Sequence, residues 1–158
     1  MNNNYAGFWL RLVACIIDGL IIGALQFIAV MPILALMGIG VASEMQNFDP
    51  SNEAEAISLV GQIMAFAGVS QFIFFGIQTL YFAFMESSNY QASIGKMVLG
   101  IKVTDINGGK LDFVKAFVRN ISKIISSFIL CIGYIMAGFT EKKQALHDMI
   151  AGTLVIKK

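Results

Sequence analysis

Charged residues are scarce in this chain. Asp, Glu, Lys and Arg make up 13% of the 158 residues and apolar residues make up 57%, whereas a soluble domain has about 25% charged and about 45–50% apolar residues. So little charge excludes a surface that faces mostly water, and the mean hydropathy of +0.74 agrees with this. The net charge of +1 provides no field that would attract nucleic acid, so no nucleic-acid partner is expected.

Cysteine and histidine are also rare. Cys15 and Cys131 both lie inside apolar runs, with no second cysteine or histidine near either one, so we interpret both as packing residues rather than disulfide or metal ligands. The only histidine, His147, stands beside Asp148, but two adjacent residues do not form a nucleophilic triad. The chain lacks a glycine-rich phosphate loop and an HExxH pattern. We therefore expect no enzyme activity, no metal and no cofactor.

Two long apolar runs predict transmembrane helices over residues 12–41 and 57–85, and the second run contains no charged residue. Each is longer than the about 20 residues that cross a bilayer. The first run is too long for the about 7–15 apolar residues of a signal peptide, so we expect a retained helix. No repeat or linker divides the chain, which predicts a single membrane domain over residues 1–158.

The middle of the chain is polar and predicts a small cytoplasmic β-hairpin over residues 93–112. Residues 97–104 alternate weakly and are β-branched, and the following Asn-Gly-Gly favours a turn, after which residues 111–113 would begin the return strand. A second candidate strand, residues 153–156, could pair with residues 98–103 if the tail lies on the same side.

Residues 113–126 predict an amphipathic helix of the kind found at membrane surfaces. Its apolar positions recur every three or four residues, and Lys115, Arg119 and Lys123 share the other face. A third membrane segment, residues 124–139, either spans the bilayer or is re-entrant. We favour the re-entrant or interfacial alternative, because it keeps the lysine-rich tail, residues 140–158, on the cytoplasmic side. The fold class is therefore an all-α membrane protein with a small β-hairpin.

The distribution of basic residues orients the chain. The loop after the first span contains none, whereas residues 86–123 contain six, and cytoplasmic segments are the ones enriched in Lys and Arg. We therefore expect a multi-pass membrane protein with a cytoplasmic N-terminus. Lys96, Lys102 and Lys110 are expected to contact anionic lipid headgroups.

Asp18 is the most informative single residue, because a charge inside a spanning helix costs about 2.5–3.5 kcal/mol on insertion scales. Arg11 lies two helical turns earlier, about 10 Å along the axis, which is too far for a direct bond. Asp18 therefore needs another partner, and its role is either a structural tie or ion or proton passage. The candidate partners are the cations Arg119 and Lys123 of the predicted amphipathic helix and the glutamines Gln71 and Gln78 of the second span.

Helix-packing signals are present in both predicted spans. Gly19 and Gly23 form a small-xxx-small motif, which permits close helix approach. Gln71 and Gln78 share one face of the second span, where they would form inter-helix hydrogen bonds or line a polar path.

Several motifs together resemble the RDD family. They are the Arg11 and Asp18 pair, the run from Ser93 to Val103, Arg119-Asn120, and the closing run from Gln144 to Thr153. The family is named for one arginine and two aspartates, which would here be Arg11, Asp18 and Asp148. The departure is Ser93-Ile94, where the family pattern has Thr-Pro.

The resemblance implies a bacterial inner-membrane protein for which transport of ions or other solutes is suspected. With a cytoplasmic tail, Asp148 would approach Arg11 or Arg119 at the membrane surface while Asp18 lies deeper. That arrangement gives a charged membrane cluster of Arg11, Asp18, Asp148 and Arg119.

Two functions follow as hypotheses. The first is transport or ion- or proton-coupling by a homo-oligomer, because two or three helices of one copy cannot enclose a polar path. The alternative is a membrane adaptor or scaffold whose basic cytoplasmic surface binds an unknown protein partner or anionic lipids. Transport predicts a dominant effect of Asp18, whereas the adaptor predicts larger effects of Lys102, Lys110 or Lys115.

Overall fold

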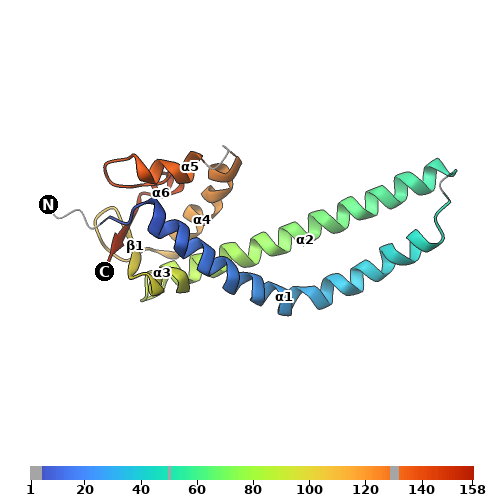
Figure 1. Ribbon diagram of the computed structural model, residues 1–158, viewed down its shortest axis with the longest axis horizontal. Coiled ribbons are helices and arrows are strands. Elements are labelled where there is room, and N and C mark those ends of the chain that lie inside the picture. Colours follow the sequence, from blue (N-terminus) through green and yellow to red (C-terminus); the bar gives the residue numbers. More distant parts are fainter. Residues whose placement is uncertain (1–4, 50, 129–131) are drawn as a thin grey trace. The chain divides into compact units, whose positions relative to one another are not determined.

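The computed structural model describes residues 5–49, 51–128 and 132–158 (Figure 1). They form two compact units. The terminal unit consists of Met1–Ile21 with Gln78–Lys158, and the hairpin unit consists of Ile22–Ile77. The expectation that Cys131 packs in an apolar run falls outside the described residues.

Two long helices, α1 (Phe8–Gln46) and α2 (Glu53–Ser87), contain the two predicted apolar runs and extend beyond both. Within the described residues, Phe8–Ile28 and Glu53–Ser87 are the segments long and apolar enough to cross a membrane. The start of α2 is capped by Asn52, whose Oδ1 accepts the backbone N–H of Ala54 at 3.1 Å. Glu53 and Glu55 in the first turn add negative charge where the helix dipole favours it.

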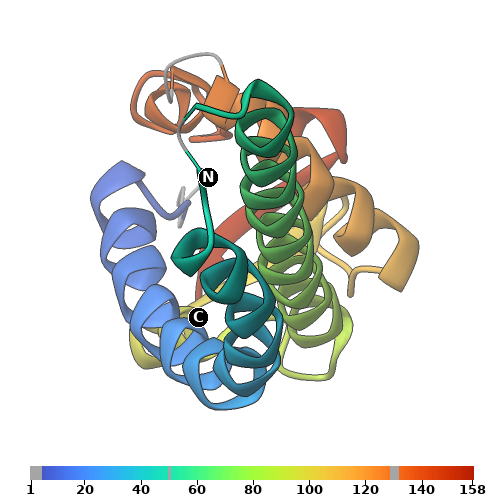
Figure 2. The same ribbon diagram turned by 90° about the vertical axis from the view of Figure 1, so that its right-hand side faces the viewer.

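The hairpin unit consists of α1 from Ile22 onward and α2 as far as Ile77 (Figure 2). The Gln26 side-chain amide donates to the carbonyl of Phe74 at 2.9 Å, and Gln62 donates to Glu44. Many large apolar side chains of this unit are more than half exposed, among them Phe27, Ile28, Leu36, Met64 and Phe72. A surface this apolar is typical of helices whose solvent is lipid.

The terminal unit contains the short elements of the fold. They are α3 (Ile94–Val98), β1 (Ile101–Asp105), α4 (Phe113–Phe128), α5 (Ile132–Ile135), the 3-10 helix η1 (Met136–Gly138), α6 (Leu146–Ile150) and β2 (Thr153–Lys157). Its apolar core is small and draws on α1, α2, β1, α4 and β2: Ala6, Ala14, Ala83, Ile101, Val103, Leu111, Ala116 and Val155.

The sheet corrects the predicted local hairpin over residues 93–112. The expected turn forms, with Gly108 at a φ of 84°, but Leu111 is buried in the core and Phe113 already begins α4. Strand β1 pairs instead with β2, antiparallel, from Ile101 opposite Lys157 to Asp105 opposite Thr153 (Figure 1). The pairing suggested between residues 98–103 and 153–156 is thus observed from residue 101 onward, and residues 97 and 98 belong to α3.

The start of the chain is held against the end. Tyr5 forms a β-bridge with Ile156, and the Ala6 amide donates to the Val155 carbonyl at 2.9 Å. The first described residues thus extend the sheet beside β2.

The predicted amphipathic helix is confirmed as α4, but its orientation is the inverse of that in a soluble domain. Its polar side chains Arg119, Asn120, Ser122 and Ser126 are buried. Its apolar side chains face outward, which is the case for Val114, Val118, Ile121 and Ile125. The terminal unit therefore has a polar interior behind an apolar helix face.

The third predicted membrane segment, residues 124–139, is not one helix in the described part of the chain. It comprises the end of α4, the four residues of α5 and the three residues of η1. Both α5 and η1 are far shorter than the about 20 residues that a crossing requires.

Candidate functional site

A buried ionic cluster lies at the centre of the terminal unit, and Arg119 on α4 connects its parts. One terminal nitrogen of Arg119 donates to both carboxylate oxygens of Glu86, at 2.6 and 2.7 Å. Its Nε and other terminal nitrogen contact Oδ1 of Asp148 at 2.9 and 2.7 Å. Burial alone would lower the pKa of Arg119, but Glu86 and Asp148 outweigh it and raise the pKa above its usual value.

Arg11, near the start of α1, completes the cluster at Asp148. Its guanidinium pairs with Oδ2 of Asp148 and also donates to the carbonyls of Ala6 at 3.0 Å and Lys143 at 2.6 Å. Asp148 in turn accepts the N–H of Ala145 at 3.1 Å, at the start of α6. Burial would raise the pKa of Asp148, but Arg119 and Arg11 hold the pKa well below its usual range. One carboxylate therefore ties α1, α4 and α6 together.

Glu86 is a member of this cluster that the sequence reasoning missed. It is fully buried in the last turn of α2 and contacts Lys96 as well as Arg119. Asn120 donates to it at 3.1 Å. The sequence did contain a signal: Glu86 is a lone acid directly after 29 uncharged residues. An acid at a helix C-terminus is disfavoured by the helix dipole, so it is expected to pair with a cation.

The sequence predicted that Lys96 contacts lipid headgroups, but Lys96 is buried beside Glu86. The side chain of Lys96 is 9% exposed, and burial lowers its pKa although Glu86 partly opposes the shift. The position follows from α3, which begins against α1 and turns Lys96 inward.

Asp18 lies apart from the guanidinium cluster and binds the start of α3. Its Oδ2 accepts the hydroxyl of Ser93 at 2.5 Å, and its Oδ1 accepts the N–H of Gly95 at 2.7 Å. The Tyr81 hydroxyl donates to the same Oδ1 at 3.4 Å and accepts the N–H of Ile94 at 3.2 Å. Among the described residues, every hydrogen-bond partner of Asp18 is neutral. None of them is one of the four partners that the sequence suggested.

Gly95 makes this contact between α1 and α3 possible. A Cβ at position 95 would lie 2.3 Å from the carbonyl oxygen of Ala14 and 2.9 Å from Cγ of Asp18. No side chain fits such a gap, so the backbone of α3 touches α1 directly.

The structure places the other predicted site residues outside the cluster. Gln78 is an exposed residue of the terminal unit, and Gln71 is an exposed residue of the hairpin unit. A Cβ added at Gly19 or at Gly23 would meet nothing within 4 Å in the described chain. The two glycines thus present open helix surface.

A second group of titratable side chains borders the ionic cluster. The ammonium of Lys123 lies 4.0 Å from the centroid of the Phe82 ring, and Nδ1 of His147 lies 3.3 Å from the Ser126 hydroxyl. Burial lowers the pKa of Lys123 to about 7. The neighbouring cations Lys96 and Arg119 contribute to this lowering, whereas Glu86 opposes the shift. Burial also keeps the pKa of His147 well below its usual value.

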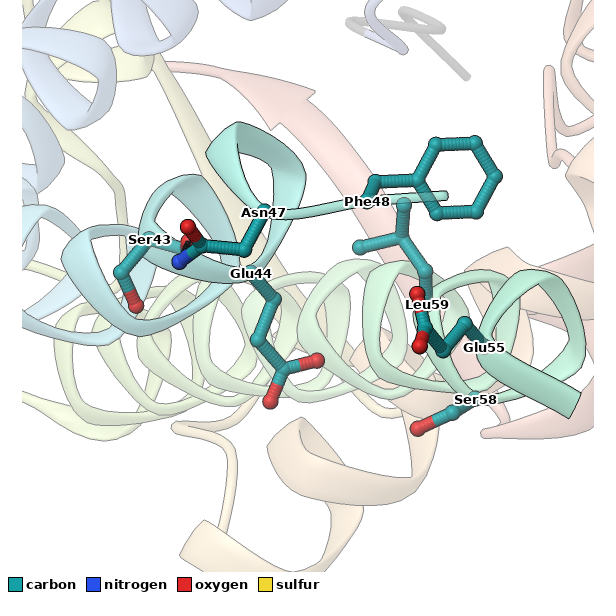
Figure 3. Close-up of a pocket in the computed structure, with 7 residues that line it drawn as sticks. All are labelled: Ser43, Glu44, Asn47, Phe48, Glu55, Ser58 and Leu59. Carbon is teal, nitrogen blue, oxygen red and sulfur yellow. Dashed lines mark hydrogen bonds between the residues drawn. The ribbon is translucent and has the colours of Figure 1, made fainter. Parts of the chain in front are cut away.

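The hairpin unit has a hollow of about 300 Å³ beside its loop (Figure 3). Both carboxylates that line it already accept hydrogen bonds, Glu44 from Gln62 and Glu55 from Asn52 and from the amide of Asp49. The lining contains no basic side chain: Ser43, Glu44, Asn47, Phe48, Glu55, Ser58 and Leu59. The buried charges of the terminal unit are therefore the stronger candidate site.

Comparison with known proteins agrees with the motifs. The RDD family model matches residues 5–152. The uncharacterized protein YxaI of Bacillus subtilis (strain 168) is 32% identical over 97% of both chains. The uncharacterized membrane protein YteJ of the same organism is 30% identical over 99% of this chain and 83% of its own length. No solved structure matches the chain.

Proposed function

Because this chain belongs to the RDD family, we propose that it is a plasma-membrane protein that couples the movement of ions or protons across the bilayer as a homo-oligomer. The proposal includes no enzymatic step. The observation that carries it is the environment of Asp18, a buried carboxylate held only by neutral donors among the described residues.

The three buried carboxylates of the terminal unit differ in a way that favours Asp18 for this role. Glu86 and Asp148 each contact two cationic side chains, so protonating either one would break ion pairs. Asp18 has no ion pair among the described residues, so a proton or a cation bound at this carboxylate would break none. Ionisable residues of this kind within membrane helices usually mark proton or ion pathways.

An oligomer is part of the proposal because two apolar helices cannot surround a polar path alone. The open surfaces at Gly19 and Gly23 would let α1 of one copy approach another helix closely. Cross-linking in native membranes should therefore yield discrete multimers, and a strictly monomeric protein would contradict this part.

The contacts between the chain ends support two crossings with both ends on one side. Arg11 binds Asp148, and Tyr5 and Ala6 pair with β2, which a third crossing before the tail would prevent. The six basic residues between positions 86 and 123 favour the cytoplasm for that side. A reporter fused after Lys158 should be active only in the cytoplasm, and activity on the outer face would contradict this topology.

A flux assay in proteoliposomes tests the transport proposal. Wild-type protein should move protons when a gradient of Na⁺ or K⁺ is imposed, and Asp18→Asn should fall to the level of protein-free vesicles. Glu141→Gln is the matched control, because it removes the same charge from an exposed site and should retain the flux. Unchanged flux in a folded Asp18→Asn protein would exclude Asp18 as the coupling residue, and absence of wild-type flux would exclude transport of these ions.

The adaptor function has one observation in its favour, the lysines that remain exposed on the terminal unit. They are Lys110, Lys115, Lys142, Lys143, Lys157 and Lys158. If an acidic partner protein docks there, Lys110→Glu with Lys142→Glu should abolish its co-purification while Asp18→Asn leaves it intact.

A further inference from the structure

The outward face of α4 is apolar and its inward face is polar. Val114 is 63% exposed and Ile125 is 48% exposed, while Arg119 and Ser126 on the opposite face are buried. In a water-soluble domain an amphipathic helix turns its apolar stripe toward the core. The inverse arrangement is stable only where the surroundings of α4 are themselves apolar.

The apolar face of α4 is continuous with the surface of a membrane helix. The ring of Phe113 at the start of α4 lies 5.0 Å from the ring of Phe84 on α2 and 6.1 Å from that of Phe117. Phe84 is itself 62% exposed and belongs to the segment Glu53–Ser87, which can cross a bilayer. Whatever covers this part of α2 therefore also reaches α4.

Cations are placed at one end of this face. Lys110 and Lys115, just before and within the first turn of α4, are exposed, and each holds a surface contact: Lys110 with Asn89 at 2.9 Å and Lys115 with Asp105 at 3.1 Å. An apolar helix face with lysines at one end matches the order of acyl chains and anionic headgroups in a leaflet.

We propose that lipid covers α4, which lies within the leaflet on the side of the chain ends. Its 16 residues extend about 24 Å, less than the about 30 Å of the hydrocarbon core, so the helix lies in one leaflet and does not cross. Acyl chains contact Val114, Val118, Ile121 and Ile125, and phosphates lie near Lys110 and Lys115. The polar interior behind α4 is thereby sealed by lipid on one side, whether or not the chain transports ions.

Tryptophan fluorescence in vesicles tests this lipid contact. The chain has one tryptophan, Trp9, so a Trp9→Phe background can carry single reporters: Val118→Trp or Ile121→Trp on the apolar face, and Asn107→Trp in the exposed turn as the control. Each protein is reconstituted in phosphatidylcholine with or without phosphatidylglycerol, using acyl chains brominated near the headgroup. The two positions on α4 serve as replicates if one variant does not fold.

The α4 reporters should lose about half of their emission to brominated chains, because interfacial helices are buried about 5–10 Å into this region. They should also resist quenching by aqueous acrylamide, and Asn107→Trp should show the opposite behaviour. Acrylamide quenching of the α4 reporters equal to that of Asn107→Trp would overturn the proposal. Protection from both quenchers that is lost on dilution with excess lipid would also overturn it, because a second copy would then be the occupant.

Discussion

Replacing Arg119 by methionine removes the guanidinium that bridges Glu86 and Asp148 and keeps a long, flexible side chain in its place. Removing one partner of a buried ion pair costs about 3–5 kcal/mol, because the opposite charge stays buried without its partner. Lys96 still pairs with Glu86 and Arg11 still pairs with Asp148, so we expect the cost to remain within that range rather than double.

Lys115→Met is the matched control, because it removes a cation from the same helix one turn earlier. Lys115 pairs with Asp105 at 3.1 Å, but its side chain is 51% exposed, against 2% for Arg119. Exposed ion pairs contribute about 0–1 kcal/mol. The two variants thus compare the same chemical change in a buried and in an exposed position.

Thermal unfolding of the protein in detergent, at one fixed scan rate, measures the difference. For a chain of this length 1 kcal/mol corresponds to about 2–4 °C, so Arg119→Met should lower the apparent Tm by about 6–20 °C and Lys115→Met by at most about 4 °C. Arg119→Lys should fall between them, because one ammonium cannot reproduce the paired hydrogen bonds of a guanidinium. Equal values for Arg119→Met and Lys115→Met would refute the idea that the buried cluster holds the terminal unit together.

Two further predictions concern other parts of the terminal unit. Gly95→Ala should lower the stability of the fold by about 1–3 kcal/mol through overpacking, because its Cβ would meet the Ala14 carbonyl and Asp18. The control Gly109→Ala, where a Cβ meets nothing within 4 Å, should leave the Tm unchanged. Equal Tm values for the two variants would contradict the close contact at Gly95. The pKa of Lys123 is about 7 in the folded state against 10.5 ordinarily, so the folded state binds fewer protons than the unfolded state between these values and stability should rise with pH from about 7 to about 10. Lys123→Met should reduce that rise in a Tm series, while Lys96, whose pKa burial also lowers, keeps its own contribution. A parallel pH profile for both proteins would contradict the assignment.

Periodicity and hydropathy were sufficient to predict the long elements of this fold. The runs over residues 12–41 and 57–85 lie in α1 and α2, and the spacing over residues 113–126 predicted α4. The same spacing could not show which face of α4 points inward. It separates an apolar face from a polar face, but it does not show whether water or lipid surrounds the helix. That choice depends on Glu86 and Asp148, which come from other helices.

The strand pairing and the partners of Asp18 depend on long-range contacts for the same reason. The Asn-Gly-Gly turn after β1 favours a local hairpin, but β2 lies about fifty residues later and contributes buried Val155 to the core. The resemblance to the family led us to expect one cluster of Arg11, Asp18, Arg119 and Asp148. The structure brings Arg11, Arg119 and Asp148 together, whereas Asp18 binds a hydroxyl and a backbone amide, and backbone donors leave no mark in a sequence.

The pairing of Arg11 with Asp148 has a consequence for biosynthesis. The acid that neutralises Arg11 is translated 137 positions after it. While the nascent chain enters the bilayer, Arg11 must rely on water or lipid phosphates, and the terminal unit cannot close before Asp148 has been translated. A premature stop between Ser87 and Asp148 would therefore leave both apolar helices inserted and expose an unfinished charged surface to membrane proteases.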